Sequence, residues 1–124
     1  MKKNGKGSIV SLCSTAGIYG SVNSAAHYAA SKGGVFGLTN TLSMQMGTYN
    51  INVNCVAPGR IDTDMTRMLT QEKIKAVVDR IPLGRLGSTE EVASIVVFLA
   101  SDRASYLTGN CIEITGGYMQ STQC

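Results

Sequence analysis

The sequence contains a single histidine, and none of its four cysteines belongs to a Cys-x-x-Cys pair. Structural zinc sites draw four ligands from closely spaced cysteines and histidines, so this composition argues against a metal site. Cys13, Cys55 and Cys111 each lie in an apolar run typical of a strand, where a reduced cysteine packs as a small hydrophobic residue. We therefore expect no metal ion, three reduced thiols in the core and a loose thiol at Cys124.

Unbalanced charge and long apolar runs are also scarce. The net charge of +3 comes from Lys2, Lys3 and Lys6, and the remaining charges balance. Because no basic stripe with interleaved aromatic residues occurs, a nucleic-acid partner is not expected. The longest apolar run, around residues 95–100, is far too short to span a bilayer, and the N-terminus lacks the pattern of a signal peptide. We expect a cytoplasmic protein that binds neither membrane nor nucleic acid.

The periodicity of what remains predicts a single α/β domain. The 124 residues suffice for one domain with a hydrophobic core but not for two. Short apolar, β-branched runs predict strands at residues 8–13, 51–57 and 110–115. Helices are predicted at residues 24–46, 70–80 and from 88 onwards, with a loop at 14–23 and an irregular or short helical segment at 60–69. Strands that alternate with helices predict a parallel sheet with right-handed crossovers.

Capping residues precede the predicted helices, and glycines interrupt the first of them. Ser24, Thr70 and Ser88 are candidate N-caps, and Ser88 together with Glu91 forms a capping box. Three glycines lie within residues 33–37, and each costs about 1 kcal/mol relative to alanine inside a helix. We expect another element to pack very close to this helix, because close packing would explain that cost.

The stretch Tyr28-Ala29-Ala30-Ser31-Lys32 carries the clearest chemical signal. A tyrosine and a lysine four residues apart on a helix lie on the same face. A nearby ammonium favours the phenolate form of a tyrosine, which brings proton transfer closer to the working pH range. Such a tyrosine can give a proton to a carbonyl oxygen, or take one from an alcohol. Alone this spacing also fits a half-buried tyrosine beside a surface lysine.

Four motifs in a fixed order give this pair its context. They are S-L-C-S-T-A-G at residues 11–17, Y-A-A-S-K at 28–32, N-C-V-A-P-G-R-I-D-T-D-M at 54–65 and I-T-G-G-Y at 114–118. Together they resemble the C-terminal half of a short-chain dehydrogenase/reductase, a Rossmann-fold family of nicotinamide-dependent oxidoreductases. The branch most similar to it contains 3-oxoacyl carrier-protein reductases and glucose-dehydrogenase-like members. The resemblance implies the C-terminal half of a doubly wound parallel sheet, with three strands and flanking helices.

The resemblance also implies roles for individual residues. Tyr28 matches the general acid/base, and Lys32 matches the residue that holds the nicotinamide ribose hydroxyls and lowers the tyrosine pKa. Ser14 matches the serine that hydrogen-bonds the substrate oxygen, and Thr15 is the alternative. The implied reaction is hydride transfer between NAD or NADP and a small-molecule carbonyl or secondary alcohol.

Further implied sites concern the cofactor and the assembly. Pro58, Gly59, Ile61 and Thr63 match the segment that, with Tyr28 and Lys32, binds the nicotinamide end of the cofactor. The Tyr28 helix and the last strand correspond to surfaces that often form subunit interfaces in this family, so a homo-oligomer, dimer or tetramer, is expected. Tyr118 is placed at a subunit contact by the same reasoning.

One expected part of the family pattern is missing from the sequence. The glycine-rich T-G-x-x-x-G-x-G turn, whose backbone amides bind the cofactor pyrophosphate, does not occur. Residues 1–7 match the end of a helix and the turn into a strand, so Met1 is expected to correspond to an internal methionine. We therefore expect a partial Rossmann domain over residues 1–124 that lacks the N-terminal dinucleotide-binding half. The alternative function is a truncated non-catalytic remnant or an oligomerisation module.

Several side chains admit two interpretations. Arg60 and Arg67 would bind an acidic substrate or remain solvated. Met65, Met68 and Leu69 would form an apolar substrate lid or pack against the core. A serine hydrolase built from Ser14 and His27 is disfavoured, because no G-x-S-x-G elbow occurs and His27 would point away from the site.

Overall fold

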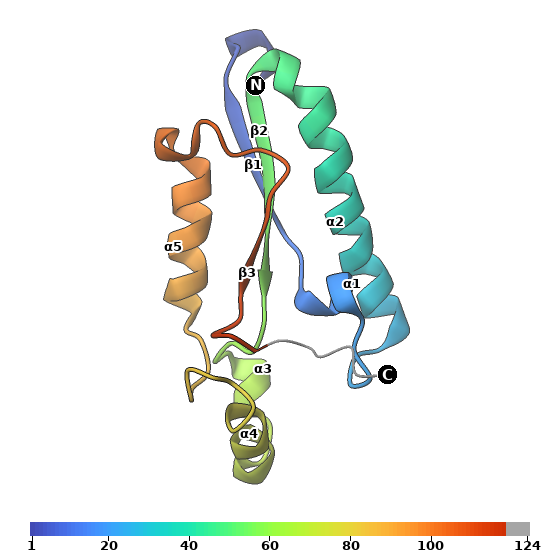
Figure 1. Cartoon of the computed structure of the whole chain (residues 1–124), viewed down its shortest axis with the longest axis vertical. Helices are drawn as coiled ribbons and strands as arrows, with labels where there is room; N and C mark the ends of the chain where they lie inside the picture. The colour runs from blue at the N-terminus through green and yellow to red at the C-terminus, as the bar shows by residue number, and fades with distance from the viewer. Residues whose placement is uncertain (119–124) are drawn as a thin grey trace.

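Three parallel strands form one sheet in the order β1-β2-β3, as the computed structural model shows for residues 1–118 (Figure 1). They are β1 (Gly7–Leu12), β2 (Ile51–Pro58) and β3 (Cys111–Ile114). Pairing of β1 with β2 begins at Gly7 and Ile51, and pairing of β2 with β3 begins at Cys55 and Cys111. The three predicted strands and the α/β class are therefore confirmed. Cys124 lies outside the described residues.

Helices cover both faces of the sheet. The long helix α2 (Ala26–Met46) and the short helix α1 (Thr15–Tyr19) lie on one side, and α5 (Thr89–Ala100) lies on the other (Figure 1). Successive side chains of β2 pack against opposite faces of the sheet. Cys55 packs in a core cluster with residues of α2, whereas Val56 packs with Leu99 of α5. Both side chains are 0% exposed, so β2 is the buried centre of the fold.

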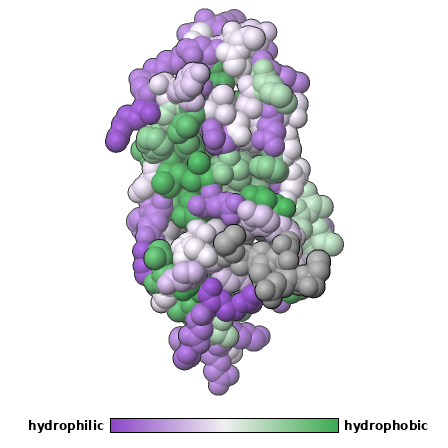
Figure 2. All heavy atoms as spheres, viewed as in Figure 1, coloured by the Kyte–Doolittle hydropathy of each residue, from purple (hydrophilic) through white to green (hydrophobic). Residues whose placement is uncertain are grey.

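A second group of short elements extends beyond the sheet. The helices α3 (Asp64–Arg67) and α4 (Gln71–Val78) project from the end where β2 finishes (Figure 1). Three 3-10 turns complete the fold: η1 (Lys2–Asn4), η2 (Gly47–Tyr49) and η3 (Asp102–Ala104). The face drawn in Figure 2 gathers hydrophobic residues across its middle and is hydrophilic at the projecting end. Within residues 1–118, no helix has both the length and the apolar character needed to cross a membrane.

The predicted loop at residues 14–23 contains a helix, which corrects the expectation from sequence. Ser14 caps α1, since its hydroxyl oxygen accepts a hydrogen bond from the Ala16 amide at 3.3 Å. Gly17, which suggested a loop, is instead a packing residue. A Cβ atom at this position would lie 2.5 Å from the backbone carbon of Lys32, so only glycine lets α1 approach α2 this closely.

The glycines of α2 have different surroundings. Gly33 faces the carbonyl oxygen of Gly17, and a Cβ there would lie 3.2 Å from it, which confirms the expected close packing at this position. Gly34 and Gly37 face open space, because no described atom lies within 4 Å of a Cβ built on either. The expectation of a close neighbour is therefore not met at these two positions within the described chain.

The expected caps are partly correct. Thr70 caps α4 by accepting a hydrogen bond from the Lys73 amide, and Ser88 forms the expected capping box with Glu91. Ser24 does not cap α2. The N-cap is the next residue, Ala25, and no side chain makes a capping hydrogen bond there. Capping preference yields here to the packing of α2 against α1 and the sheet.

The capping box of α5 makes stability depend on pH. The Glu91 carboxylate accepts hydrogen bonds from Arg85 at 2.7 and 2.9 Å and from the Ser88 amide at 2.7 Å. Arg85 and then the Ser88 amide lower the pKa of Glu91 from 4.5 to about 2. A carboxyl group with a lowered folded-state pKa stabilises the fold fully above its unfolded pKa. That contribution is lost as the pH falls from about 4.5 to about 2.

We expect Glu91→Gln to lower the urea midpoint of unfolding at neutral pH and to lose this deficit as the pH approaches 2. Measuring urea unfolding of parent and variant across that range tests the prediction. Glu72→Gln, at an exposed position on α4 that has no ion pair within the described chain, is the control and should show no such trend. A deficit independent of pH would contradict the expected role of the carboxylate.

Candidate active site

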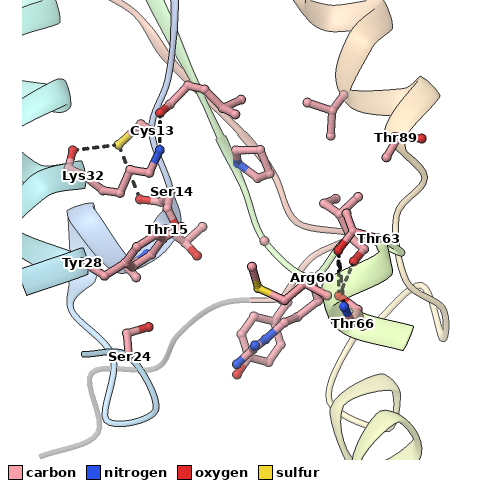
Figure 3. Close-up of a pocket in the computed structure, with 18 of the residues that line it drawn as sticks. Cys13, Ser14, Thr15, Ser24, Tyr28, Lys32, Arg60, Thr63, Thr66 and Thr89 are labelled. Atoms are coloured by element: carbon pink, nitrogen blue, oxygen red, sulfur yellow. Dashed lines mark hydrogen bonds between the residues drawn. The ribbon is translucent and has the colours of Figure 1, made fainter. Parts of the chain in front are cut away.

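A pocket of about 620 Å³ lies beyond the carboxyl ends of β1 and β2. One wall comes from the end of β1, from α1 and from the start of α2, and carries Ser14, Thr15, Ser24, Tyr28 and Lys32 (Figure 3). The opposite wall is formed by the segment after β2 and by the start of α5, and it carries Thr63, Thr66 and Thr89 (Figure 3). In open parallel α/β sheets, ligands usually bind at this end of the strands.

Tyr28 and Lys32 reach the pocket from the first two turns of α2. Tyr28 is 42% exposed, so its phenol is accessible from the pocket. The Lys32 ammonium lies 5.9 Å from the centroid of the Tyr28 ring, within the range of a cation–π contact. It also donates a hydrogen bond to the carbonyl oxygen of Leu12 at 2.8 Å. The last residue of β1 thus holds the lysine beside the tyrosine.

The two candidate hydroxyls on the neighbouring segment differ in burial. Ser14 is partly exposed, and its oxygen already accepts a hydrogen bond from the Ala16 amide. Because a hydroxyl can donate and accept at once, the Ser14 proton can still be offered to a ligand. Thr15 is only 5% exposed, although it also lines the pocket. The structure brings both near Tyr28 and makes Ser14 the more accessible of the two.

The buried thiol of Cys13, at the end of β1, contacts the backbone of α2. Cys13 is 2% exposed, and its thiol donates to the backbone carbonyl oxygen of Lys32 at 3.2 Å. Burial is the main cause that raises the pKa of the Cys13 thiol. Burial likewise raises the pKa of the Cys111 thiol, which packs against the same core cluster. Cys13 and Cys111 thus pack as small apolar groups in and against the core, as the sequence predicted.

The segment after β2 is fixed by backbone contacts. The Gly59 amide donates to the Ile114 carbonyl oxygen at 2.9 Å, and a Cβ at Gly59 would lie 3.2 Å from Thr115. The Ile61 carbonyl oxygen accepts a hydrogen bond from the Thr66 hydroxyl at 2.7 Å. Thr63 caps α3, and its hydroxyl lies 3.3 Å from that of Thr66. Pro58, Gly59, Ile61 and Thr63 all line the pocket, as expected for one site.

Arg60 and Arg67 differ in whether they line the pocket, and the methionines of this segment are exposed. Arg67 makes two hydrogen bonds to Asp62, at 2.9 and 3.1 Å, and lowers the pKa of that carboxyl group. Arg60 lines the pocket, whereas Arg67 does not. Met65 and Met68 are 80% and 84% exposed, which contradicts the interpretation that they pack against the core. Met65 lines the pocket, in agreement with the lid interpretation.

His27 and Tyr118 differ in their position relative to the pocket. His27 is exposed and does not line the pocket, so it does not meet Ser14 there. Tyr118 was expected at a subunit contact, but it is only 7% exposed and lines the pocket. The positive φ angles of Gly116 and Gly117, 62° and 83°, form the turn that directs the chain to this position.

Sequence reasoning did not place Cys13, Thr66 or Thr89 at the pocket. Thr66 lies three residues after the cap of α3, and that spacing was a signal that could have been used. Thr89 was recognised only as part of the start of α5. Its position at the pocket follows from how α5 packs against the sheet, which local sequence does not encode.

The sequence and the fold were compared with known proteins. A model of the enoyl-(acyl carrier protein) reductase family matches residues 1–119. The 3-oxoacyl-(acyl-carrier-protein) reductase FabG of Thermotoga maritima is 50% identical over 117 residues, which cover 94% of this chain and 47% of that protein. The FabG protein of Pseudomonas aeruginosa is 46% identical over 121 residues, covering 98% and 49%. The chain thus spans about half the length of the curated relatives that it matches.

Solved structures agree in fold. A 3-oxoacyl-(acyl-carrier protein) reductase of Brucella melitensis superposes with a TM-score of 0.92 at 39% identity, covering 96% of this chain and 45% of that chain. A second reductase from Brucella melitensis, crystallised with bound NAD, superposes with a TM-score of 0.87 at 38% identity, covering 96% and 44%.

Proposed function

This chain belongs to the short-chain dehydrogenase/reductase family, and from that premise we propose that it serves hydride transfer between NAD or NADP and a carbonyl or secondary alcohol. The observation that carries the proposal is the convergence of Ser14, Tyr28 and Lys32 on one pocket at the carboxyl ends of the strands. These side chains come from two segments, and they are the residues that the family pattern selects. The names of the relatives, which are 3-oxoacyl reductases, support a carbonyl substrate.

In the proposed mechanism the side chains of this chain manage the substrate oxygen and its proton. The Tyr28 hydroxyl gives its proton to the carbonyl oxygen during reduction, or takes one from the alcohol during oxidation. The Ser14 hydroxyl donates a hydrogen bond to the same oxygen and stabilises the charge that develops there. Lys32, held by the Leu12 carbonyl oxygen, keeps a positive charge beside the Tyr28 ring. The nicotinamide cofactor, when bound, supplies or accepts the hydride.

The residues present fit the nicotinamide end of such a cofactor. Lys32 and Thr63 offer polar groups on opposite walls of the pocket (Figure 3). Gly59 keeps the wall after β2 free of a side chain and close to Thr115. The glycine-rich turn that would bind the pyrophosphate is not part of this sequence. We therefore propose that the chain contributes the catalytic and nicotinamide-binding half of the site.

The alternative is a non-catalytic or oligomerisation module, and one observation favours it. Leu38 and Met44 on α2 are 54% and 75% exposed, and Gly34 and Gly37 on the same helix face open space. A helix surface of this kind suits contact with another helix. The same surface supports the proposal of a homo-oligomer, so oligomeric state cannot separate the two functions. Cofactor binding can separate them.

Saturation-transfer NMR with NADH and NADPH, with the 124-residue chain as receptor, is the direct test. We expect saturation of the nicotinamide ring protons for at least one cofactor, and a clear loss of this signal in Lys32→Ala. Lys73→Ala, at an exposed position on α4, is the matched control and should bind as the parent does. Absence of nicotinamide saturation in the parent would favour the non-catalytic module.

A further inference from the structure

The pocket has a positive charge that the proposed chemistry does not use. Its described lining contains two cationic side chains, Lys32 and Arg60, and no carboxylate. The Lys32 ammonium already donates to the Leu12 carbonyl oxygen and lies beside Tyr28. Arg60 directly follows Pro58-Gly59, and in the view of Figure 3 it lies between the two walls. It is partly buried, and its own carbonyl oxygen accepts the Gly87 amide at 3.0 Å, which fixes its backbone.

Arg60 differs from Arg67 and Arg85, two arginines near this end of the molecule that are bound to carboxylates. Arg80 has no ion pair among the described residues either, but it lies over the Tyr118 ring, 5.4 Å from its centroid, and does not line the pocket. Arg67 is bound to Asp62 and also lies 3.5 Å from Asp64. Arg85 forms a two-pronged contact with Glu91. Within residues 1–118, Arg60 has neither an ion-pair partner nor a side-chain hydrogen bond. As far as residues 1–118 are concerned, the donors of the Arg60 guanidinium are therefore available to a ligand.

A partly buried guanidinium without a counter-charge attracts anions strongly. Its planar set of N–H donors matches the two oxygens of a carboxylate or a phosphate. Removal from bulk water strengthens the attraction, because the effective dielectric constant is lower in a pocket than at an open surface. Apolar side chains of Ile61, Met65 and Val92 share the same lining. The pocket therefore suits a molecule with an anionic group on an apolar body.

We propose that Arg60 is a specificity-determining residue that binds an anionic group of the substrate, a carboxylate, while the substrate carbonyl meets Ser14 and Tyr28. This inference rests on the proposed function, because it concerns the substrate of the same site. It selects oxo acids over neutral ketones of the same size. The phosphates of the cofactor are the other source of the same chemistry, and the test must separate the two.

The test compares oxo acids with their methyl esters, which keep the same carbonyl on the same carbon chain but lack the negative charge. The probes are acetoacetate, levulinate and 5-oxohexanoate, in which the distance between carbonyl and carboxylate increases stepwise. Binding is measured by saturation-transfer NMR, and turnover by oxidation of NADH or NADPH. Arg60→Gln is the variant, and Arg103→Gln, an exposed position on η3 away from the pocket, is the matched control.

We expect the parent and Arg103→Gln to bind at least one oxo acid more tightly than its ester. Arg60→Gln should lose about ten- to hundred-fold of affinity for that acid, as for a charged hydrogen bond, and bind the ester as before. Arg60→Lys should recover part of this preference. Equal binding of acid and ester in the parent would overturn the proposal. A selective loss of NADH or NADPH affinity in Arg60→Gln, with the acid preference unchanged, would also overturn it and assign Arg60 to the cofactor.

The outcomes separate this inference from the proposed function. If the ester is reduced at the same rate by parent and Arg60→Gln and no acid is preferred, hydride transfer stands and the role of Arg60 fails. If an acid binds in a manner that depends on Arg60 but is never reduced, the anion site stands and the proposed reaction of this chain fails.

Discussion

Tyr28→Phe is expected to lower the rate of carbonyl reduction by about 10²- to 10⁴-fold, the usual contribution of a general acid or base. Phenylalanine keeps the ring that lies 5.9 Å from the Lys32 ammonium, so the shape of the pocket should be preserved. Only the proton donor is removed. Cofactor affinity should therefore change little. Steady-state oxidation of NADH or NADPH with a carbonyl substrate, together with a direct measurement of cofactor binding, tests both halves of this expectation.

Tyr49→Phe provides the matched control for this substitution. Tyr49 is 43% exposed, nearly the same as Tyr28 at 42%, but it lies on η2 beside Lys2 and not at the pocket. It should keep the parental rate. Equal rates in Tyr28→Phe and the parent would rule out the proposed role of the phenol, whereas a parallel loss of cofactor binding would indicate a collapsed pocket.

The largest expected effect on stability comes from Gly17→Ala. The added Cβ would lie 2.5 Å from the backbone carbon of Lys32 and 2.7 Å from the Gly33 nitrogen, and neither atom can move without displacing α2. Overpacking of this kind typically costs about 1–3 kcal/mol and sometimes more. Because Ser14 caps the same short helix, a shift of α1 would also move the Ser14 hydroxyl. Urea unfolding measures the first effect, and the rate of carbonyl reduction measures the second.

Gly34→Ala is the control within the same region. A Cβ at Gly34 meets nothing within 4 Å among the described residues, so in the monomeric chain the substitution should raise the free energy of unfolding by about 0.5–1 kcal/mol through the helix preference of alanine. Opposite signs for these two glycines are the expected result. Equal effects would mean that the close approach of α1 and α2 contributes nothing to stability. Destabilisation by Gly34→Ala would instead indicate that another surface packs there in solution.

The fold was predictable where one local pattern determined it. Residues 51–57 are mostly apolar and β-branched, which predicts a strand, and β2 is a strand buried on both faces. Its buried Asn54 is accommodated because its side chain donates to the Leu107 carbonyl oxygen and accepts from the Asn110 amide. Ser88 and Glu91 predicted the start of α5 because the capping box is formed within four consecutive residues. The helix α1 was missed because Gly17 breaks helices in isolation. Only contact with α2, distant in sequence, explains why glycine is required there.

The candidate site was predictable to the extent that the family pattern marks it. Ser14, Tyr28, Lys32 and Thr63 were selected from sequence, and all four line one pocket, although their chemical roles remain predictions. The hydrogen bond from Lys32 to the Leu12 carbonyl oxygen was not foreseen, because any backbone carbonyl could have been its partner. The burial of Tyr118 at the pocket was not foreseen for a related reason. Its position depends on the turn at Gly116 and Gly117 and on the packing of neighbouring segments, which spacing alone does not encode.

The parallel sheet also has a consequence for how the chain folds. Gly7 pairs with Ile51, and Cys55 pairs with Cys111, so every strand pairing joins segments that are far apart in sequence. Closing such long loops costs entropy before any contact repays it, and folding rates fall as the average separation of contacts rises. The contacts within α2 are local, so this helix can form early. We therefore expect slow folding, in which one edge of β2 stays unpaired until β3 docks beside it.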